Sequence, residues 1–446
     1  MIRITQSRIN IHFLVGILIT SLGLSLLTFN SSYLNQKSLK NSSISANLKV
    51  SDYNSPLEII WGEDGDVDIG RDLILDSSNN IYVAGYSNGF SSSVDAIIAK
   101  FDKNGNPLMT IIWDKGYNDA AYGITLDSLG NIYITGNYDA SGSGNYDIFI
   151  AKFDSNGNSL DNITLGGPNN DDAYDIEVDN SGNIYIAGSL GSQDTFIAKF
   201  DSSGAPLFNI TWDRVEEDKS EGLALDDSGN IYYTGYNETA PNYDAFVAKS
   251  DNLGNGLFNR TWDKSNNDFG YDIALDSNEN LYITGRSAFD AFVAKYSNSG
   301  THLWDFIWAG TGNDYGIKLA LDASDNIYMA GYFVSGTPDP DAFIAKFDSA
   351  GNSLCNLTWG GSTYDYFYAI DLDNEGTIYV TGSTNSPGNE DIILAIYSVD
   401  DESNGEIDDD DDDDDDDVEL MIPGYNLLFV PSILIIFSYI VKFRRK

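Results

Sequence analysis

The sequence predicts an all-β fold, a seven-bladed β-propeller of four-stranded antiparallel blades, and two observations predict it. The block Asn-Ile-Tyr-x-x-Gly, with small variations, occurs seven times, and its tyrosines lie at residues 82, 133, 185, 232, 282, 328 and 379. No segment between residues 51 and 400 has sustained helical periodicity. Repeats of about 50 residues that each hold four strands are typical of propellers.

Each repeat contains four short segments joined by turns, as the second copy illustrates. Its first strand, 122–127, alternates and ends in aspartate, and a turn leads to the second strand, 131–136. A variable loop precedes the third strand, 147–154, and an Asx-Gly turn follows it. A typical fourth strand, 208–212, ends in a tryptophan that recurs in six copies, with Leu165 in the seventh. Alternation between such turns indicates antiparallel hairpins, and the repeated tryptophan is expected to be core between blades.

The order of the strands predicts how the ring closes. The repeat region opens with an isolated fourth strand at 57–61, and the last copy ends at 391–397 with no fourth strand after it. We therefore expect strand 57–61 to complete the last blade, which closes the ring and covers a strand edge. The alternative, an open solenoid, leaves unpaired edges exposed.

The repeat resembles the SBBP-type β-propeller repeat of bacterial and archaeal surface proteins. The resemblance is clearest in the third copy, at Gly166-Gly167, Asp171-Asp172 and the segment from Asp179 to Gly188. It implies the propeller fold and a place at the cell surface, whereas the biochemical role of that family is poorly defined. The turn departs from this pattern in the first, fifth, sixth and seventh copies, which leaves the predicted fold unchanged.

Charge and composition exclude several functions. The net charge of −44, from 68 acidic and 24 basic residues, repels phosphates, so neither nucleic acid nor a nucleotide is an expected partner. The single cysteine, Cys355, allows no internal disulfide. His12 and His302 are the only histidines, which argues against a Ser-His-Asp triad, Cys-His catalysis or a histidine-rich metal site. No catalytic residue and no cofactor is predicted.

Both ends of the chain indicate export and membrane anchoring. Residues 1–46 are expected to be a signal peptide or signal anchor plus linker, because Arg3 and Arg8 precede an apolar run at 11–29. The propeller is expected over 51–400. An acidic stalk follows at 401–417, ending in ten consecutive aspartates, and residues 418–446 form a predicted transmembrane helix with a basic cytoplasmic tail. This order places the propeller outside the cell on a single-pass anchor.

The anchor segment carries a second resemblance. The arrangement Ile422-Pro423-Gly424-Tyr425, an apolar run and a basic tail is similar to the C-terminal sorting signals of archaeal surface proteins. The resemblance implies processing by a sortase-like enzyme, in which the helix is exchanged for a lipid.

Three aspartate positions are filled in all seven repeats. The first ring precedes the first strand's alternating part and comprises Asp68, Asp119, Asp171, Asp218, Asp268, Asp314 and Asp365. The second ring ends the first strand and comprises Asp76, Asp127, Asp179, Asp226, Asp276, Asp322 and Asp373. The third ring begins the third strand and comprises Asp95, Asp147, Asp194, Asp244, Asp290, Asp341 and Asp391.

Strand direction assigns the first and third rings to one face and the second ring to the other. The first ring is the candidate for calcium, which takes carboxylate oxygens. The alternative is structural, with each side chain accepting backbone N–H bonds in a loop and linking neighbouring blades. Seven equal copies favour the structural interpretation.

The loops between second and third strands differ most between repeats, and variable loops on a rigid scaffold are typical sites of recognition. Their aromatic residues are the predicted ligand-face residues: Tyr86, Phe90, Tyr138, Tyr236, Tyr243, Phe289, Tyr332 and Phe333. Asn-x-Ser/Thr acceptors for N-glycosylation lie at Asn162, Asn209, Asn237, Asn259 and Asn356, four in the outer strand and Asn237 in a loop. The predicted function is binding, adhesion or scaffolding toward an unknown protein or glycan. The alternative is an extracellular glycoside hydrolase or lyase.

Overall fold

The computed structural model describes residues 56–398 apart from 63–65, 91–92, 192–193, 213–217, 240, 265, 311, 335–338, 362, 386–389. It also describes two short paired strands, β1 (Ile19–Thr20) and β2 (Gly23–Leu24), in a separate unit. The predicted signal segment, acidic stalk, transmembrane helix and sorting signal lie outside the described residues, except for these two strands. Within the described part, no helix is long and apolar enough to cross a membrane.

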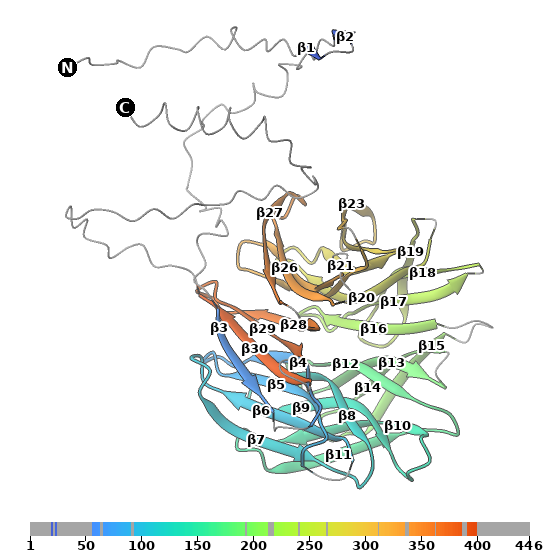
Figure 1. The fold of residues 1–446 in the computed structure, drawn as a ribbon. Coiled ribbons are helices and arrows are strands. Elements are labelled where there is room, and N and C mark those ends of the chain that lie inside the picture. Colours follow the sequence, from blue (N-terminus) through green and yellow to red (C-terminus); the bar gives the residue numbers. More distant parts are fainter. Residues whose placement is uncertain are drawn as a thin grey trace, which may run out of the picture. The chain divides into compact units, whose positions relative to one another are not determined.

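Residues 57–397 form seven four-stranded antiparallel sheets that follow one another in chain order (Figure 1). Blade one holds β4 (Asp68–Leu75), β5 (Ile81–Ser87), β6 (Asp95–Phe101) and β7 (Pro107–Trp113); blade two holds β8 (Asp119–Leu126), β9 (Ile132–Asp139), β10 (Tyr146–Phe153) and β11 (Ser159–Leu165). Blade three holds β12 (Asp172–Val178), β13 (Ile184–Leu190), β14 (Asp194–Phe200) and β15 (Pro206–Trp212); blade four holds β16 (Asp218–Leu225), β17 (Ile231–Thr239), β18 (Asn242–Ser250) and β19 (Gly256–Trp262).

The remaining blades repeat this arrangement. Blade five holds β20 (Asp268–Leu275), β21 (Leu281–Ser287), β22 (Asp290–Tyr296) and β23 (His302–Trp308), and blade six holds β24 (Asp314–Leu321), β25 (Ile327–Phe333), β26 (Asp341–Phe347) and β27 (Ser353–Trp359). Blade seven holds β28 (Asp365–Leu372), β29 (Ile378–Thr384), β30 (Asp391–Tyr397) and β3 (Leu57–Trp61). The prediction of a seven-bladed, four-stranded propeller is confirmed.

The ring is closed by the strand that the sequence assigned to this role. β3 pairs antiparallel with β30, with Ile59 opposite Leu394. The innermost strands contact one another all the way around, including β28 against β4, so the open solenoid is excluded.

Tight turns join the first and second strands of each blade. Asp127 accepts hydrogen bonds from the backbone N–H groups of Leu129 and Asn131, and Gly130 has a left-handed φ of 77°. Blades one, five and six have Asn79, Glu279 and Asp325 at the glycine position, and all three take a φ of 59°. The departures from the repeat pattern therefore leave the turn geometry intact.

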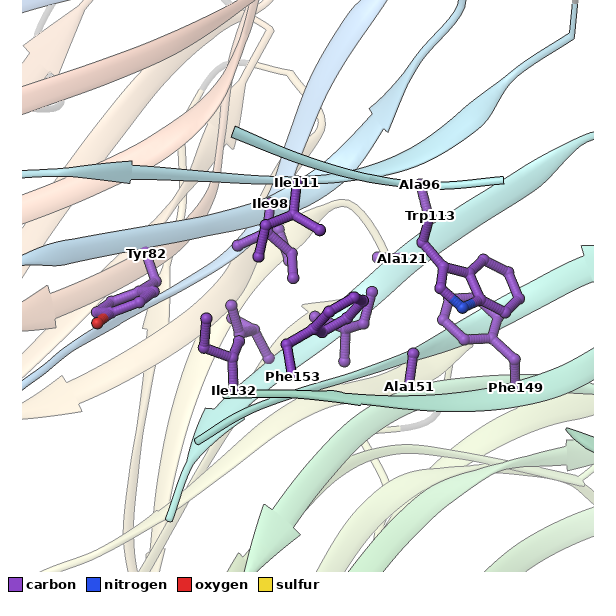
Figure 2. Close-up of a cluster of buried hydrophobic side chains, with 13 residues drawn as sticks. Tyr82, Ala96, Ile98, Ile111, Trp113, Ala121, Ile132, Phe149, Ala151 and Phe153 are labelled. Carbon is purple, nitrogen blue, oxygen red and sulfur yellow. The ribbon is translucent and has the colours of Figure 1, made fainter. Parts of the chain in front are cut away.

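The hydrophobic core lies between blades. In the cluster between blades one and two, Trp113 of β7 stacks on Phe149 of β10, with ring centroids 3.9 Å apart (Figure 2). The same contact joins Trp262 to Phe292 and Trp308 to Phe343. Stacked aromatic pairs contribute about 0.5–1.5 kcal/mol beyond their buried area. The repeated tryptophan therefore belongs to the scaffold, as predicted.

Candidate functional site

The second aspartate ring is part of the scaffold. The Tyr82 hydroxyl donates a hydrogen bond to Asp76 Oδ2 at 3.3 Å, and the ammonium of Lys100 lies 4.5 Å from the Tyr82 ring centroid. Burial would raise the pKa of Asp76, yet hydrogen bonds from Asn80 and Ser78 hold that pKa below its ordinary value. Six blades carry this Asp-Tyr-Lys cluster, and blade seven has Ile396 opposite its tyrosine. The polar groups of these clusters already interact with one another, so few of their hydrogen-bonding positions are left for a ligand.

The innermost strand of every blade contains a β-bulge, which the repeat pattern of the sequence does not indicate. Each has a β-bulge three residues after its first-ring aspartate, where two residues oppose one on the next strand. The bulged residues are Arg71, Tyr122, Tyr174, Glu221, Tyr271, Ile317 and Tyr368. Scaffold positions are alike in all blades, whereas this position carries four residue types.

All seven bulged residues line one cavity of about 430 Å³, together with Asp72, Lys318 and Tyr332. We call this cavity the axial cup, because residues from seven blades can share a cavity only at the ring axis. The bulges lie near the start of the innermost strands, where Asp68 pairs with Ser87 at the end of β5. The axial cup is therefore at the end of the ring that carries the loops between second and third strands.

An arginine is held in the axial cup by rings from three blades. The guanidinium carbon of Arg71 lies 4.7 Å from the Tyr368 ring centroid, 5.5 Å from that of Tyr86 and 5.6 Å from that of Tyr122. Its Nη2 donates to the Tyr86 hydroxyl at 3.3 Å, and its Nε is buried with no partner among the described residues. Burial raises the pKa of Tyr122 and of Tyr368 to about 12, so both hydroxyls stay protonated. The axial cup thus combines aromatic faces with hydrogen-bond donors.

Tyrosine stacking continues around the rim. Tyr332 stacks on Tyr315 at 4.5 Å and meets the edge of Tyr366 at 4.8 Å. Arg286 donates to the Tyr315 hydroxyl at 2.6 Å. These contacts link blades five, six and seven, so the rim is a preformed aromatic surface.

A charge cluster lies beneath the axial cup. The ammonium of Lys318 is 3.7 Å from Asp72 Oδ1, 3.8 Å from Asp175 Oδ1 and 3.5 Å from Asp272 Oδ1. Asp72 and Lys318 line both the axial cup and a second cavity of about 660 Å³ on the turn side, which Glu177 and Asp371 also line. One lysine therefore neutralises part of a strongly acidic layer on the axis.

Four carboxylates of this layer connect neighbouring blades. Each accepts a hydrogen bond from a backbone N–H of the next blade. The pairs are Asp72 with Ile124 at 3.0 Å, Asp175 with Leu223 at 2.8 Å, Asp272 with Leu319 at 2.7 Å and Asp371 with Leu75 at 3.0 Å. Aspartates do link the blades, but these four belong to none of the three repeated rings.

The axial carboxylates predict that the protein is less stable at alkaline pH. Burial raises the pKa of Asp72 to about 7, of Glu177 to about 8 and of Asp272 to about 6. The folded state then holds protons that the unfolded chain has released, so the free energy of unfolding falls as pH rises from about 5 to 8. Thermal unfolding at about pH 5.5 and about pH 8.5 checks this. A Glu177→Gln/Asp272→Asn variant should show a smaller decrease, and an unchanged slope would contradict the assignment.

The predicted ligand-face aromatics divide into four groups. Tyr332 lines the axial cup, and Tyr86 contacts its arginine. Tyr236 and Tyr243 pack around Phe269, which lies against the bulged Tyr271. Tyr138, Phe333 and Phe90 pack against the tryptophans 113, 308 and 61, and Phe289 is 66% exposed.

The expectation that all eight aromatics lie in loops needs correction. Only Phe90 and Phe289 do, because the second and third strands continue pairing beyond the repeated glycine. Asn237 is likewise in β17, opposite Asp244, and is 5% exposed rather than in a loop. Of the other glycosylation acceptors, Asn162, Asn209 and Asn259 are exposed on outer strands, and Asn356 is partly buried.

The first and third rings lie at the junctions between blades. The backbone N–H of Asp119 in blade two donates to the carbonyl of Val94, which precedes Asp95 of blade one, at 2.8 Å. Equivalent bonds are made by Asp68, Asp171, Asp314 and Asp365. Each of these five first-ring aspartates, calcium candidates in the sequence, therefore lies next to the third-ring aspartate of the preceding blade.

Comparisons with known proteins agree with this architecture. The β-propeller repeat model SBBP matches residues 60–90, 112–137 and 256–292. A search of curated protein sequences gives no match. Among solved structures, a catalytically inactive histidine-to-alanine variant of virginiamycin B lyase from Staphylococcus aureus with quinupristin shares 12% identity and a TM-score of 0.53, over 77% of this chain and all of that one.

Two further solved structures are less similar. YCF48 bound to D1 peptide shares 12% identity over 78% of this chain and 97% of that one, with a TM-score of 0.48. Sqt1 from Chaetomium thermophilum shares 11% identity over 72% of this chain and 80% of that one, with a TM-score of 0.46. The seven sheets and their shared cavity define the chain as a seven-bladed β-propeller with an axial cup. More particularly, three of its segments match the SBBP-type β-propeller repeat.

Proposed function

We propose that this protein is a cell-surface binding module whose axial cup takes a glycan. One observation carries the proposal: the seven bulges direct the non-repeating side chains of the innermost strands into one cavity. Pockets of about 300–1,000 Å³ with a few polar groups among aromatic faces are typical of small-ligand sites. Tyrosine rings match the C–H faces of sugar rings, and Arg71, Glu221 and tyrosine hydroxyls suit sugar hydroxyls.

The surrounding segments are proposed to support display outside the cell. The exported N-terminus, the acidic stalk and the C-terminal anchor would hold the propeller away from a membrane, and a sortase-like enzyme would act on the anchor. Sugars on the exposed outer-strand asparagines would leave the axial cup accessible, because these residues belong to the strands farthest from the axis. No nucleotide, nucleic acid or cofactor is proposed as a partner.

The binding proposal is tested on a glycan array with the purified protein and two cup variants. Arg71→Gln and Tyr271→Ala should each weaken binding of a captured glycan at least about 10-fold, since buried central contacts carry most of the binding energy. Phe289→Ala, which removes an exposed ring outside the axial cup, should change affinity less than about twofold.

The outcome that contradicts the proposal is equally specific. If the cup variants bind normally while Phe289→Ala abolishes binding, the ligand is held by the outer loops. If only peptides bind, the protein is a protein-binding module instead.

A second candidate function is a glycoside hydrolase or lyase, and the axial acids favour it. Carboxyls with raised pKa beside a cavity are typical of general acids. The similarity to a lyase structure, at 12% identity, supports the fold alone. Cleavage of a bound glycan that is lost in a variant of the cup-lining Asp72, Asp72→Asn, would establish this second function.

A further inference from the structure

Two blade junctions bring together three carboxylates. One oxygen from each of Asp95, Asp114 and Asp119 lies within 4.8 Å of the other two. Between blades four and five, Asp244, Asp263 and Asp268 form the same arrangement. In each triad, one residue lies in the first part of the third strand, one follows the tryptophan that ends the fourth strand, and one begins the innermost strand of the next blade.

The backbone fixes the member of each triad that begins the innermost strand, which is fully buried in both triads. Asp119 Oδ2 accepts the backbone N–H of Lys115 at 2.7 Å, and Asp268 Oδ2 accepts that of Lys264 at 2.7 Å. The lysine side chains point elsewhere. The Lys115 ammonium lies 5.4 Å from the Trp113 ring centroid, and that of Lys264 is 3.0 Å from Asp305.

The second carboxylate oxygen of each buried aspartate is unsatisfied. Asp119 and Asp268 are both 0% exposed, and Oδ1 of each has no hydrogen-bond partner among the described residues. Buried polar atoms without a partner are rare in native proteins, and a bound ion commonly satisfies such an atom. Burial raises the pKa of Asp119 to about 7; the charges of Asp114 and Asp95 also raise this pKa, whereas the backbone N–H and the charge of Lys115 lower it.

We propose that each triad binds a calcium ion that links two neighbouring blades. Oxygens that share a calcium at about 2.4 Å lie at most about 4.8 Å apart, which the triads satisfy. Asp114 and Asp263 are exposed, so the ion can enter from solvent, and waters complete its coordination. The sites are distinct from the axial cup.

The other junctions provide an internal comparison. At the position of Asp114 they carry Gly62, Gly166, Ala309 and Gly360, and Asp213 lies outside the described residues. Since these junctions form the same blade contact, the third carboxylate is not required for folding. A role in ligand binding explains why the third carboxylate is present at some junctions and absent at others.

The test uses full-length protein freed of metal with EDTA. Millimolar calcium should raise the melting temperature by at least about 3 °C, and magnesium should raise it less. Terbium should give luminescence sensitised by the neighbouring tryptophans, Trp113 and Trp262. Asp114→Ala/Asp263→Ala should fold, because Ala309 occupies this position naturally, and should lose both responses.

Two controls separate the triads from other acidic groups. Asp161→Ala removes an exposed carboxylate of an outer strand and should keep both responses. The ten-aspartate run is present in every variant, so its own terbium binding cancels in the comparison. Conversely, Ala309→Asp should add a terbium signal beside Asp290 and Asp314. An unchanged melting temperature in calcium, or equal terbium signals in wild type and the Asp114→Ala/Asp263→Ala variant, would overturn the proposal.

Discussion

Replacing Lys318 by methionine should lower the free energy of unfolding by about 3–5 kcal/mol at pH 8, the usual cost of removing one partner from a buried ionic cluster. Its ammonium is within 3.8 Å of three carboxylates, and no other cation contacts these oxygens within the described residues. Methionine has similar volume, so the loss arises from charge rather than from a cavity. Urea unfolding followed by tryptophan fluorescence measures it.

Lys318→Met should lower the free energy of unfolding less at acidic pH than at pH 8. Near pH 5 the raised pKa values of Asp72 and Asp272, about 7 and 6, let these groups accept protons in place of the lost lysine. Adding Asp175→Asn and Asp272→Asn to Lys318→Met should restore much of the stability at pH 8, because an amide oxygen still accepts the N–H of the next blade.

A surface lysine provides the control for this experiment. Lys264 pairs with Asp305 at 3.0 Å and is 41% exposed, so Lys264→Met should cost less than about 1 kcal/mol. If Lys318→Met is no more destabilising than Lys264→Met, the axial ion cluster contributes little to the stability of the ring.

The fold was predictable because the same residues recur at the same positions in all seven repeats. The tyrosines and aspartates that recur in all repeats form the turns and the cores between blades, and they locate every strand. The closing strand was predictable because residues 57–61 have no preceding partner in the sequence while the last repeat lacks its fourth strand. Both arguments depend on positions that are alike between copies.

Apart from Tyr332, the lining of the candidate site escaped prediction because it occupies the positions that differ between repeats. A strict two-residue alternation places Arg71 and Asp72 on opposite faces, yet the bulge between Gly70 and Asp72 lets both line the axial cup. The contact between Asp72 and Lys318 depends on closure of the ring, so local sequence carries no sign of it. Comparing the seven copies for their differences at the third residue after the first-ring aspartate would have indicated the cup.

Introducing aspartate at Ile59 should destabilise the protein about as strongly as the loss of Lys318, because β3 closes the ring. Ile59 and Trp61 pack with Leu394 of blade seven and Phe101 of blade one, while Glu58 accepts a hydrogen bond from Trp359 of blade six at 2.7 Å. One short strand thus contacts three blades. A charge placed at Ile59 would have no partner in this apolar cluster, which predicts a loss of about 3–5 kcal/mol.

The adjacent residue of the same strand is the matched control. Ile60 is 51% exposed, so Ile60→Asp should change the free energy of unfolding by less than about 1 kcal/mol while altering charge and β-propensity equally. Ile59→Asp should also expose the edge of β30, and light scattering should then report association through that edge. If both variants unfold at the same denaturant concentration, β3 is dispensable and the innermost strands alone hold blade seven against blade one.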